Sequence, residues 1–135
     1  MNNDFYTLTT YIHNKEKITY PMEDYLEMIY RNKDNKITIT SLSKNLNIKK
    51  SSCSKMISKL KTLELVSINN NNIILTPNGI KIGAYLYHRH QILETFLKNL
   101  NKEQFCLEQV EKLEHFIDET TLTNLEKQIN KYPAE

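Results

Sequence analysis

The sequence predicts a mainly α-helical protein, with an N-terminal winged helix-turn-helix domain followed by a C-terminal helical domain. Apolar residues recur at three- and four-residue spacings along most of the 135 residues, which is typical of amphipathic helices. Strand character is strongest in two short β-branched runs, 65–68 and 73–75, which flank four consecutive asparagines. Glycine and proline are scarce, with 2 and 3 residues. This composition excludes collagen-like, loop-dominated and Gly-loop nucleotide-binding architectures.

The segments that follow residue 20 are predicted to be two helices joined by a short strand. Pro21 stands where helices accept proline, in the first turn, and apolar residues follow it at helical spacing for about three turns. The brief alternation over 37–39 predicts one short strand. Thr40 or Ser41 then caps a second helix, which we expect to end at Asn47.

A third helix, expected from about residue 50 to 63, has two contrasting faces. Short hydroxyls and lysines occupy one face, so a large partner can approach it closely. The other face is an apolar stripe of Cys53, Met56, Ile57, Leu60 and Leu63. The hairpin follows, with its tip in the asparagine run, because asparagine tolerates positive φ.

Three more helices are predicted in the C-terminal half. Thr76 and Pro77 supply the N-cap and first position of a long helix that reaches about residue 100. A fifth helix is expected over about 102–117. A last helix starts at Thr120 or Thr121 and is ended by Pro133.

We therefore divide the chain into an unassigned extension (1–20), the winged helix-turn-helix domain (21–76) and the C-terminal helices (77–135). No apolar run approaches the roughly 20 residues that cross a bilayer, and the first residues lack the pattern of a signal peptide. Cys53 and Cys106 form no disulfide or CxxC framework, so we expect both in the core of a cytoplasmic protein with no membrane partner.

Charge is unevenly distributed behind a net charge of +2. Residues 35–63 contain seven lysines and no acidic residue, whereas residues 102–135 contain four lysines and eight carboxylates. A basic block can bind a polyanion and an acidic block can bind cations, the alternative being two solvated faces of opposite sign.

Several carboxylates and imidazoles fall on shared helix faces, at spacings of three or four residues. The candidates are Asp24, Glu27, His90, Glu111, Glu114 and His115. Taken singly, such residues more often belong to solvated faces or to a hydrogen-bonded core. Four carboxylates gathered around one point repel one another unless cations offset them. Oxygen-rich sites with one or two imidazoles suit Mn²⁺ or Fe²⁺.

The sequence also resembles the diphtheria toxin repressor (DtxR) family, most closely its manganese-responsive branch. Five segments carry the resemblance and occur in the family's order: 22–30, 51–60, 75–83, 87–90 and 110–115. It implies that the six candidates hold two Mn²⁺ ions per protomer, with Glu111 and Glu114 bridging. The iron-sensing branch has Met where this chain has Asp24 and Cys where it has Glu111, and two hard oxygens in place of two soft sulfurs favour Mn²⁺. Fe²⁺, Co²⁺, Zn²⁺ and Cd²⁺ are possible substitutes.

The resemblance further implies a metal-dependent repressor of metal-uptake genes that binds double-stranded operator DNA as a homodimer. Such a protein is not an enzyme and has no small-molecule substrate. The third helix is expected to enter the major groove, and the C-terminal helices to form the dimerisation domain. The expected DNA-contacting residues are Lys49, Lys50, Ser51, Ser52, Ser54, Lys55 and Lys59.

Two other functions remain open at this point. A metal-independent winged-helix regulator of the MarR kind shares the basic segment and the wing, but it needs none of the six ligands. A dinuclear metallohydrolase uses the same ligands with an open position for water, but it does not need the block of seven lysines.

Overall fold

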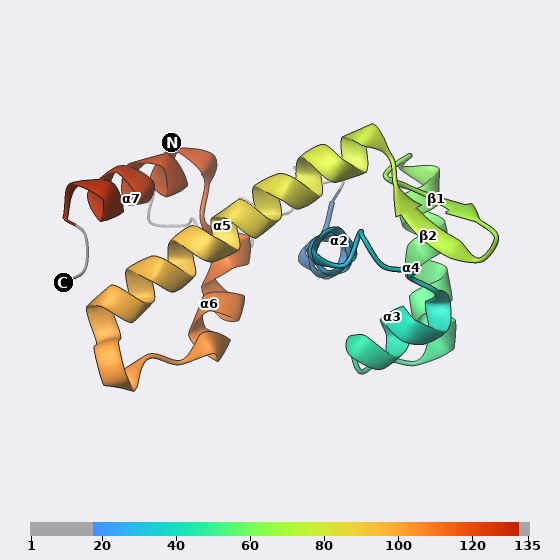
Figure 1. Ribbon diagram of the computed structural model, residues 1–135, viewed down its shortest axis with the longest axis horizontal. Coiled ribbons are helices and arrows are strands. Elements are labelled where there is room, and N and C mark those ends of the chain that lie inside the picture. Colours follow the sequence, from blue (N-terminus) through green and yellow to red (C-terminus); the bar gives the residue numbers. More distant parts are fainter. Residues whose placement is uncertain (1–17, 133–135) are drawn as a thin grey trace, which may run out of the picture.

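A computed structural model describes residues 18–132, which form two helical halves joined by one long helix (Figure 1). The expected extension falls mostly outside these residues, as does the helix end expected at Pro133. The elements in chain order are α2 (Tyr20–Arg31), α3 (Ile39–Asn45), α4 (Lys50–Thr62), β1 (Val66–Asn69), β2 (Asn72–Leu75), α5 (Pro77–Asn101), the 3₁₀-helix η2 (Lys102–Gln104), α6 (Leu107–Leu113), the 3₁₀-helix η3 (Glu114–Phe116) and α7 (Glu119–Lys131).

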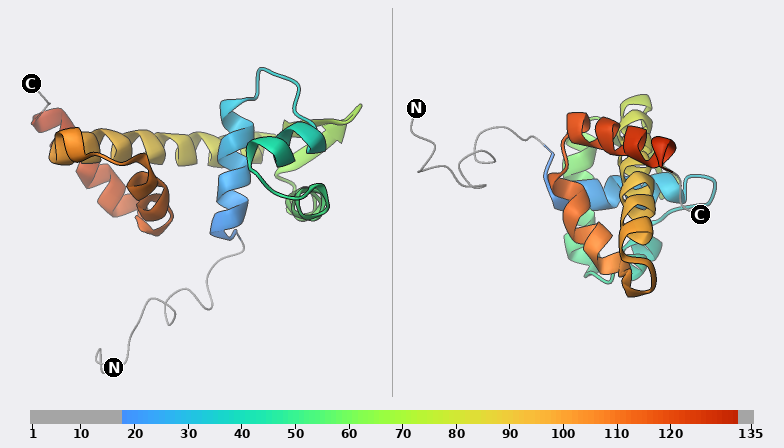
Figure 2. Two further views of the ribbon diagram at one scale, coloured as in Figure 1. Left: turned by 90° about the horizontal axis from the view of Figure 1, so that it is seen from below. Right: turned by 90° about the vertical axis from the view of Figure 1, so that its left-hand side faces the viewer.

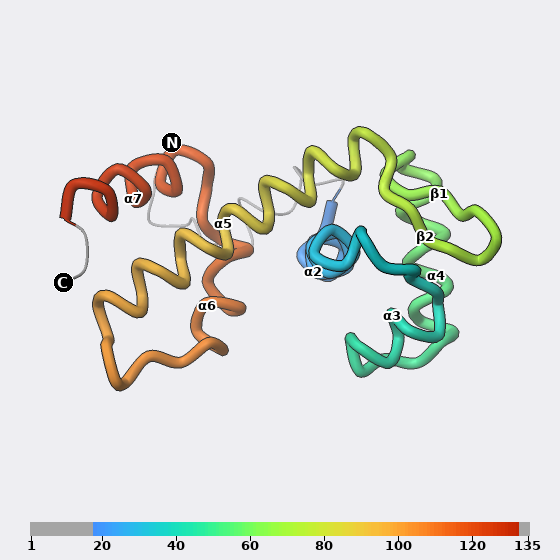
Figure 3. Tube along the Cα trace, viewed as in Figure 1, coloured from blue at the N-terminus to red at the C-terminus, as the bar shows by residue number. Residues whose placement is uncertain are grey.

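The arrangement places α2 between the two halves. Helices α3 and α4 and the hairpin gather at the N-terminal end of α5, whereas α6 and α7 pack along its C-terminal end (Figures 1 and 3). Figure 2 shows α2 crossing the middle of α5. One apolar core fills the winged half, and a smaller core of Leu93, Leu97 and Val110 lies in the C-terminal half. No helix in the described range 18–132 is both long and apolar enough to span a membrane.

The short strand expected over 37–39 is wrong. Ile37 is buried and makes two hydrogen bonds to the hairpin: its N–H donates to Asn72 Oδ1 at 2.9 Å, and its carbonyl accepts from Ile73 N–H at 2.7 Å. The next residue, Thr38, is already the N-cap of α3, so no chain is left to extend this contact into a strand.

Helix α3 is confirmed but starts earlier than predicted. Thr38 and Ser41 form a capping box, in which Thr38 Oγ1 accepts from Ser41 N–H at 3.1 Å and Ser41 Oγ accepts from Thr38 N–H at 2.9 Å. The cap is therefore Thr38, not Thr40 or Ser41. The predicted stop at Asn47 is confirmed, since its φ of 56° cannot continue a helix.

Helix α4 and the hairpin agree with the sequence pattern. Cys53, Ile57 and Leu60 are fully buried. The strands pair antiparallel from Val66↔Leu75 to Asn69↔Asn72. The two residues of the tip, Asn70 and Asn71, have φ of 51° and 65°, as a two-residue I′ turn requires.

The N-terminus of α5 is capped as predicted. Thr76 Oγ1 accepts from Gly79 N–H at 3.1 Å, while its own hydroxyl donates to the carbonyl of Glu64 at 2.6 Å. These hydrogen bonds fix the start of α5 next to the residues that precede β1. Gly79 packs closely there, because a Cβ at this position would lie 2.0 Å from the carbonyl oxygen of Leu65.

The single helix expected over 102–117 is wrong. Lys102 has a φ of 53°, and the segment is divided into η2, α6 and η3. Cys106 lies in an extended conformation at the N-cap of α6, so it is exposed rather than in the core. The last helix begins just before the predicted residues, with Asp118 as its N-cap.

Candidate metal centre and nucleic-acid interface

All six candidate metal ligands lie close together where α2, α5 and the α6–η3 segment meet. Two overlapping groups of three residues place their ligand atoms within 4.8 Å of one another. The first group is Glu27, His90 and Glu114, and the second is Asp24, Glu114 and His115. Glu114 belongs to both groups, which is the arrangement that a bridging carboxylate needs.

The first group is fully enclosed. All three of its residues are buried. His90 Nδ1 lies 2.8 Å from Glu114 Oε2 and 3.9 Å from Glu27 Oε2. Glu111 reaches the same nitrogen from a more exposed position, with Oε1 at 3.6 Å. His90 therefore turns Nδ1 toward three carboxylates.

The second group lies on the other side of Glu114. His115 Nε2 is 2.9 Å from Asp24 Oδ1 and 4.0 Å from Glu114 Oε1. Glu114 is 0% exposed, and Oε1 has no hydrogen-bond partner among the described residues. A buried carboxylate oxygen without a partner is costly. A cation at this position would satisfy it, so the residues present fit a metal ion.

Burial and crowding raise the pKa values of two of these carboxyl groups. Burial, and then the neighbouring charge of Glu114, raise the pKa of Glu27 to about 7 although Arg31 contacts its carboxylate. The same two causes raise the pKa of Glu111. The hydrogen bond to Glu114 raises the pKa of His90. Near pH 7 the Glu27 carboxyl is therefore partly protonated, and a cation can replace that proton.

Two residues at this site, Glu23 and Arg89, were missed by the sequence analysis. Glu23 Oε1 lies 2.9 Å from His115 Nδ1, and Arg89, which is 4% exposed, places a guanidinium nitrogen 3.3 Å from the same oxygen. Burial lowers the pKa of His115, but hydrogen bonds to Asp24 and Glu23 outweigh it and raise this pKa to about 9. The only sequence signal was adjacency, since Glu23 precedes Asp24 and Arg89 precedes His90.

The predicted DNA-contacting residues form an exposed surface on and just before α4. All seven are exposed: Lys49, Lys50, Ser51, Ser52, Ser54, Lys55 and Lys59. A groove of about 660 Å³ adjoins them and is lined by Ser43, Lys44, Asn47, Ile48, Lys49 and Ser52. Lys44 was not predicted, although it belongs to the basic block. The hairpin tip, residues 69–71, is also exposed.

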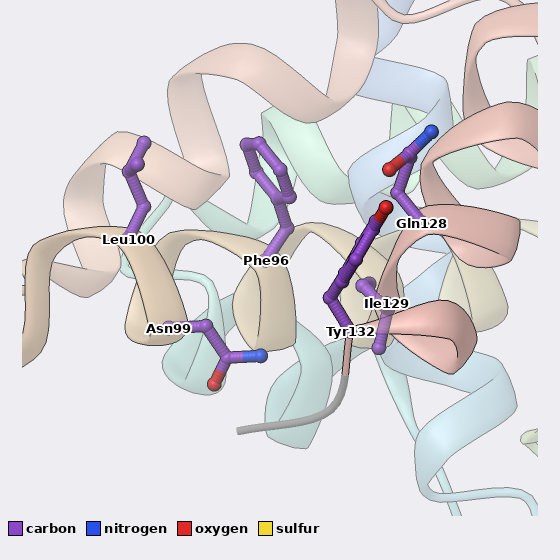
Figure 4. A pocket seen from close by; sticks show the side chains of 6 residues that line it. All are labelled: Phe96, Asn99, Leu100, Gln128, Ile129 and Tyr132. Atoms are coloured by element: carbon purple, nitrogen blue, oxygen red, sulfur yellow. The ribbon is translucent and has the colours of Figure 1, made fainter. Parts of the chain in front are cut away.

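The C-terminal half presents a separate apolar surface. A pocket of about 230 Å³ opens between α5 and α7 (Figure 4), lined by Phe96, Asn99, Leu100, Gln128, Ile129 and Tyr132. Leu100 and Tyr132 are 64% and 66% exposed. Large apolar side chains left this exposed are typical of surfaces that bind another protein chain.

Two family models match the chain, and together they span nearly all of the described residues. Residues 17–72 match "Iron dependent repressor, N-terminal DNA binding domain". Residues 76–134 match "Iron dependent repressor, metal binding and dimerisation domain". The chain belongs to the iron-dependent repressor family. The resemblance to DtxR-type regulators is thereby confirmed, and so is the mainly helical architecture with two domains of this kind.

Individual members of the iron-dependent repressor family show the same relationship. The HTH-type transcriptional regulator MntR of Geobacillus thermodenitrificans is 37% identical over 103 residues, which is 73% of each chain. The manganese regulator SloR superposes with a TM-score of 0.71 at 28% identity, covering 82% of this chain and 54% of SloR. The structure of ScaR with bound Zn²⁺ superposes with a TM-score of 0.71 at 27% identity, and the match covers 84% of this chain and 55% of ScaR. The chain thus spans about half the length of these solved family members.

Proposed function

We propose that this protein is a metal-dependent, Mn²⁺-responsive transcriptional repressor that binds operator DNA and controls genes for metal-ion uptake. One observation carries the proposal: ligand-type side chains from both halves of the molecule converge on the buried carboxylate of Glu114, whose Oε1 has no hydrogen-bond partner among residues 18–132. Membership of the iron-dependent repressor family supports it, because the matching domains are DNA-binding and metal-binding ones.

The residues that would hold two Mn²⁺ ions are Asp24, Glu27, His90, Glu111, Glu114 and His115, and Glu114 is the one that belongs to both groups of ligand atoms. When bound, the metal supplies positive charge that offsets the repulsion among the carboxylates. The donor set contains oxygen and nitrogen but no sulfur, which favours Mn²⁺ over softer metals. Fe²⁺, Co²⁺, Zn²⁺ and Cd²⁺ can be held by the same donors.

The way in which metal would control DNA binding follows from which elements carry the ligands. Asp24 and Glu27 lie on α2 of the DNA-binding half, whereas the other four lie on α5, α6 and η3. Without a counter-charge the carboxylates repel, and α2 is free to shift against the C-terminal half. With their charge offset, one relative position of the two halves is favoured, so metal occupancy selects one placement of α4.

We propose that α4 enters the major groove, with the lysines mostly on phosphates and the serines on base edges or phosphates. In a homodimer, two copies of α4 would read half-sites about one DNA turn, roughly 34 Å, apart. The apolar surface between α5 and α7 (Figure 4) is a suitable place for the second copy, because it lies in the half that matches a dimerisation domain.

Fluorescence anisotropy tests this function. The probe is a labelled duplex that the protein, with Mn²⁺ present, selects from a random-sequence pool. Affinity should be highest with Mn²⁺, lower with Fe²⁺, Co²⁺ or Zn²⁺, and lowest with chelator. Failure to select any duplex, or equal affinity in all these conditions, would contradict the proposal.

The variant E111A separates the two remaining alternatives from this function. A metal-independent regulator of the MarR kind would bind DNA unchanged after loss of Glu111, whereas we expect the Mn²⁺ response to be lost. A dinuclear metallohydrolase would show metal-dependent turnover of ester or amide substrates, which we do not expect. The variant E126Q is the matched control, because Glu126 is an exposed carboxylate paired with the exposed His88 at 3.1 Å.

A further inference from the structure

We propose that Glu23 is a positioning residue for His115: its carboxylate holds the proton on Nδ1, so that Nε2 is the nitrogen turned toward the metal centre. This inference rests on the proposed function, which it deepens by adding a residue that is not a ligand. Histidine ligands commonly donate their second ring N–H to a carboxylate, which fixes the tautomer and the ring orientation.

The geometry of His115 separates its two nitrogens. Nε2 faces the two proposed co-ligands, with Asp24 Oδ1 at 2.9 Å and Glu114 Oε1 at 4.0 Å. Nδ1 faces away from them, toward Glu23 Oε1 at 2.9 Å. An ionised carboxylate can accept hydrogen bonds but cannot donate them. The Glu23 carboxylate therefore favours a proton on His115 Nδ1. The ring is also held by Tyr20, whose centroid lies 5.7 Å from that of His115.

Because Arg89 lies next to His115, Glu23 is needed to keep the proton on Nδ1. The same guanidinium nitrogen that donates to Glu23 Oε1 at 3.3 Å lies 3.4 Å from His115 Nδ1. Arginine is only a donor, so an unopposed Arg89 would favour an unprotonated Nδ1. The remaining proton would then sit on Nε2, where it blocks coordination. Glu23 is nearer to Nδ1 than Arg89 is, and it engages Arg89 itself.

The three residues also come from three of the four elements that carry the proposed metal ligands. Glu23 lies on α2, Arg89 on α5 and His115 on η3. Arg89 is 4% exposed and the Glu23 side chain is 21% exposed, so both are held largely out of water. The contact therefore orients the His115 ring relative to α2 through residues of this chain alone.

Two substitutions at Glu23 distinguish positioning from a merely structural role. E23L keeps the approximate volume and removes the acceptor, which leaves Arg89 as the neighbour of Nδ1. E23Q keeps the shape and an acceptor, because the donor Arg89 forces the amide oxygen, not the NH₂, into the place of Oε1. E126Q, beside the exposed His88, is the control for removing a carboxylate next to a histidine.

The experiment uses the full-length protein with two readouts. Mn²⁺ affinity is measured by competition with a fluorescent chelator, and the His115 ring is observed by ¹H–¹⁵N NMR of the Zn²⁺-loaded protein. Wild type should show a slowly exchanging Nδ1–H proton. We expect E23L to lose that signal and to bind Mn²⁺ roughly 10- to 100-fold more weakly. E23Q should retain the signal and lie between E23L and wild type in affinity, and E126Q should match wild type.

The outcomes separate this inference from the proposed function. If wild type binds Mn²⁺ but E23L binds it within threefold of wild type, or keeps the protected Nδ1–H proton, the role of Glu23 is overturned and the repressor function stands. If E23Q loses as much affinity as E23L, the positioning role is likewise overturned. If wild type binds neither Mn²⁺ nor Zn²⁺, the proposed function itself fails and this inference fails with it.

Discussion

Replacing Glu114 with glutamine (E114Q) tests the metal centre at the residue that both ligand groups share. Glu114 is 0% exposed; Oε2 contacts His90 Nδ1 at 2.8 Å and Oε1 has no partner among residues 18–132. Glutamine preserves the shape and a hydrogen bond to His90 but removes the negative charge. We therefore expect opposite effects on the stability of the metal-free protein and on its affinity for Mn²⁺.

The expected gain in metal-free stability follows from the perturbation of Glu27. A pKa raised from 4.5 to about 7 corresponds to a penalty of about 3 kcal/mol for ionising this carboxyl within the fold. Repulsion by Glu114 is the second cause of the shift, after burial. Relieving it should raise the free energy of unfolding at pH 8 by about 1 kcal/mol. The pKa of Glu111 is raised by burial and then by the same neighbour, so loss of the Glu114 charge acts there in the same direction.

The assay compares wild type, E114Q and the exposed control E126Q. Urea unfolding of chelator-treated protein at pH 8 gives the free energy of unfolding, and competition with a fluorescent chelator gives the Mn²⁺ affinity. E114Q should unfold at higher urea yet bind Mn²⁺ at least 100-fold more weakly, which is about 2.7 kcal/mol; E126Q should change neither. A Mn²⁺ affinity within threefold of wild type would refute the shared-ligand assignment.

Three further predictions concern the proton balance, the DNA surface and the fold. The pKa values of Glu27 and His115 are raised to about 7 and about 9, so the folded metal-free protein binds more protons than the unfolded chain between about pH 4.5 and 9. Its Tm should therefore fall as pH rises through this window, while Mn²⁺ affinity rises; a Tm that climbs from pH 6 to 8 would contradict this. K55Q should weaken binding to all duplexes and lower the slope of log affinity against log salt by about 1. Fluorescence anisotropy from about 50 to about 200 mM salt measures this slope. G79A should lower the free energy of unfolding by about 2 kcal/mol, measured in urea, because its Cβ would lie 2.0 Å from Leu65 O; unchanged stability would contradict that packing.

The features of the fold that local chemistry controls could be predicted from the sequence. The Thr76 cap, the tight asparagine tip and the buried stripe of α4 each depend on a few neighbouring residues. The segment 102–117 could not be predicted in this way. Its apolar spacing resembles one helix, but the backbone turns at Lys102 and Cys106 takes an extended conformation outside α6.

In the candidate site too, local spacing could be predicted from the sequence, whereas tertiary contacts could not. Helical spacing alone pairs Asp24 with Glu27, and Glu111 with Glu114. The same spacing adds His115 to the second pair. It says nothing of how α2 crosses α5, and only the family resemblance brought the two groups together with His90. Glu23 and Arg89 escaped prediction because their contacts to His115 span 92 and 26 residues of sequence. Such contacts arise from the packing of three elements and leave no periodic signal.

The most direct test of the central claim is the affinity of the full-length protein for Mn²⁺ with and without its selected DNA duplex. If metal occupancy and DNA binding are coupled through this centre, linkage requires the duplex to tighten Mn²⁺ binding by the factor by which Mn²⁺ tightens DNA binding. We predict a factor of roughly 5 to 150, as is typical of such coupling, and its loss in E114Q. The same Mn²⁺ affinity in the presence and absence of the duplex would contradict the account.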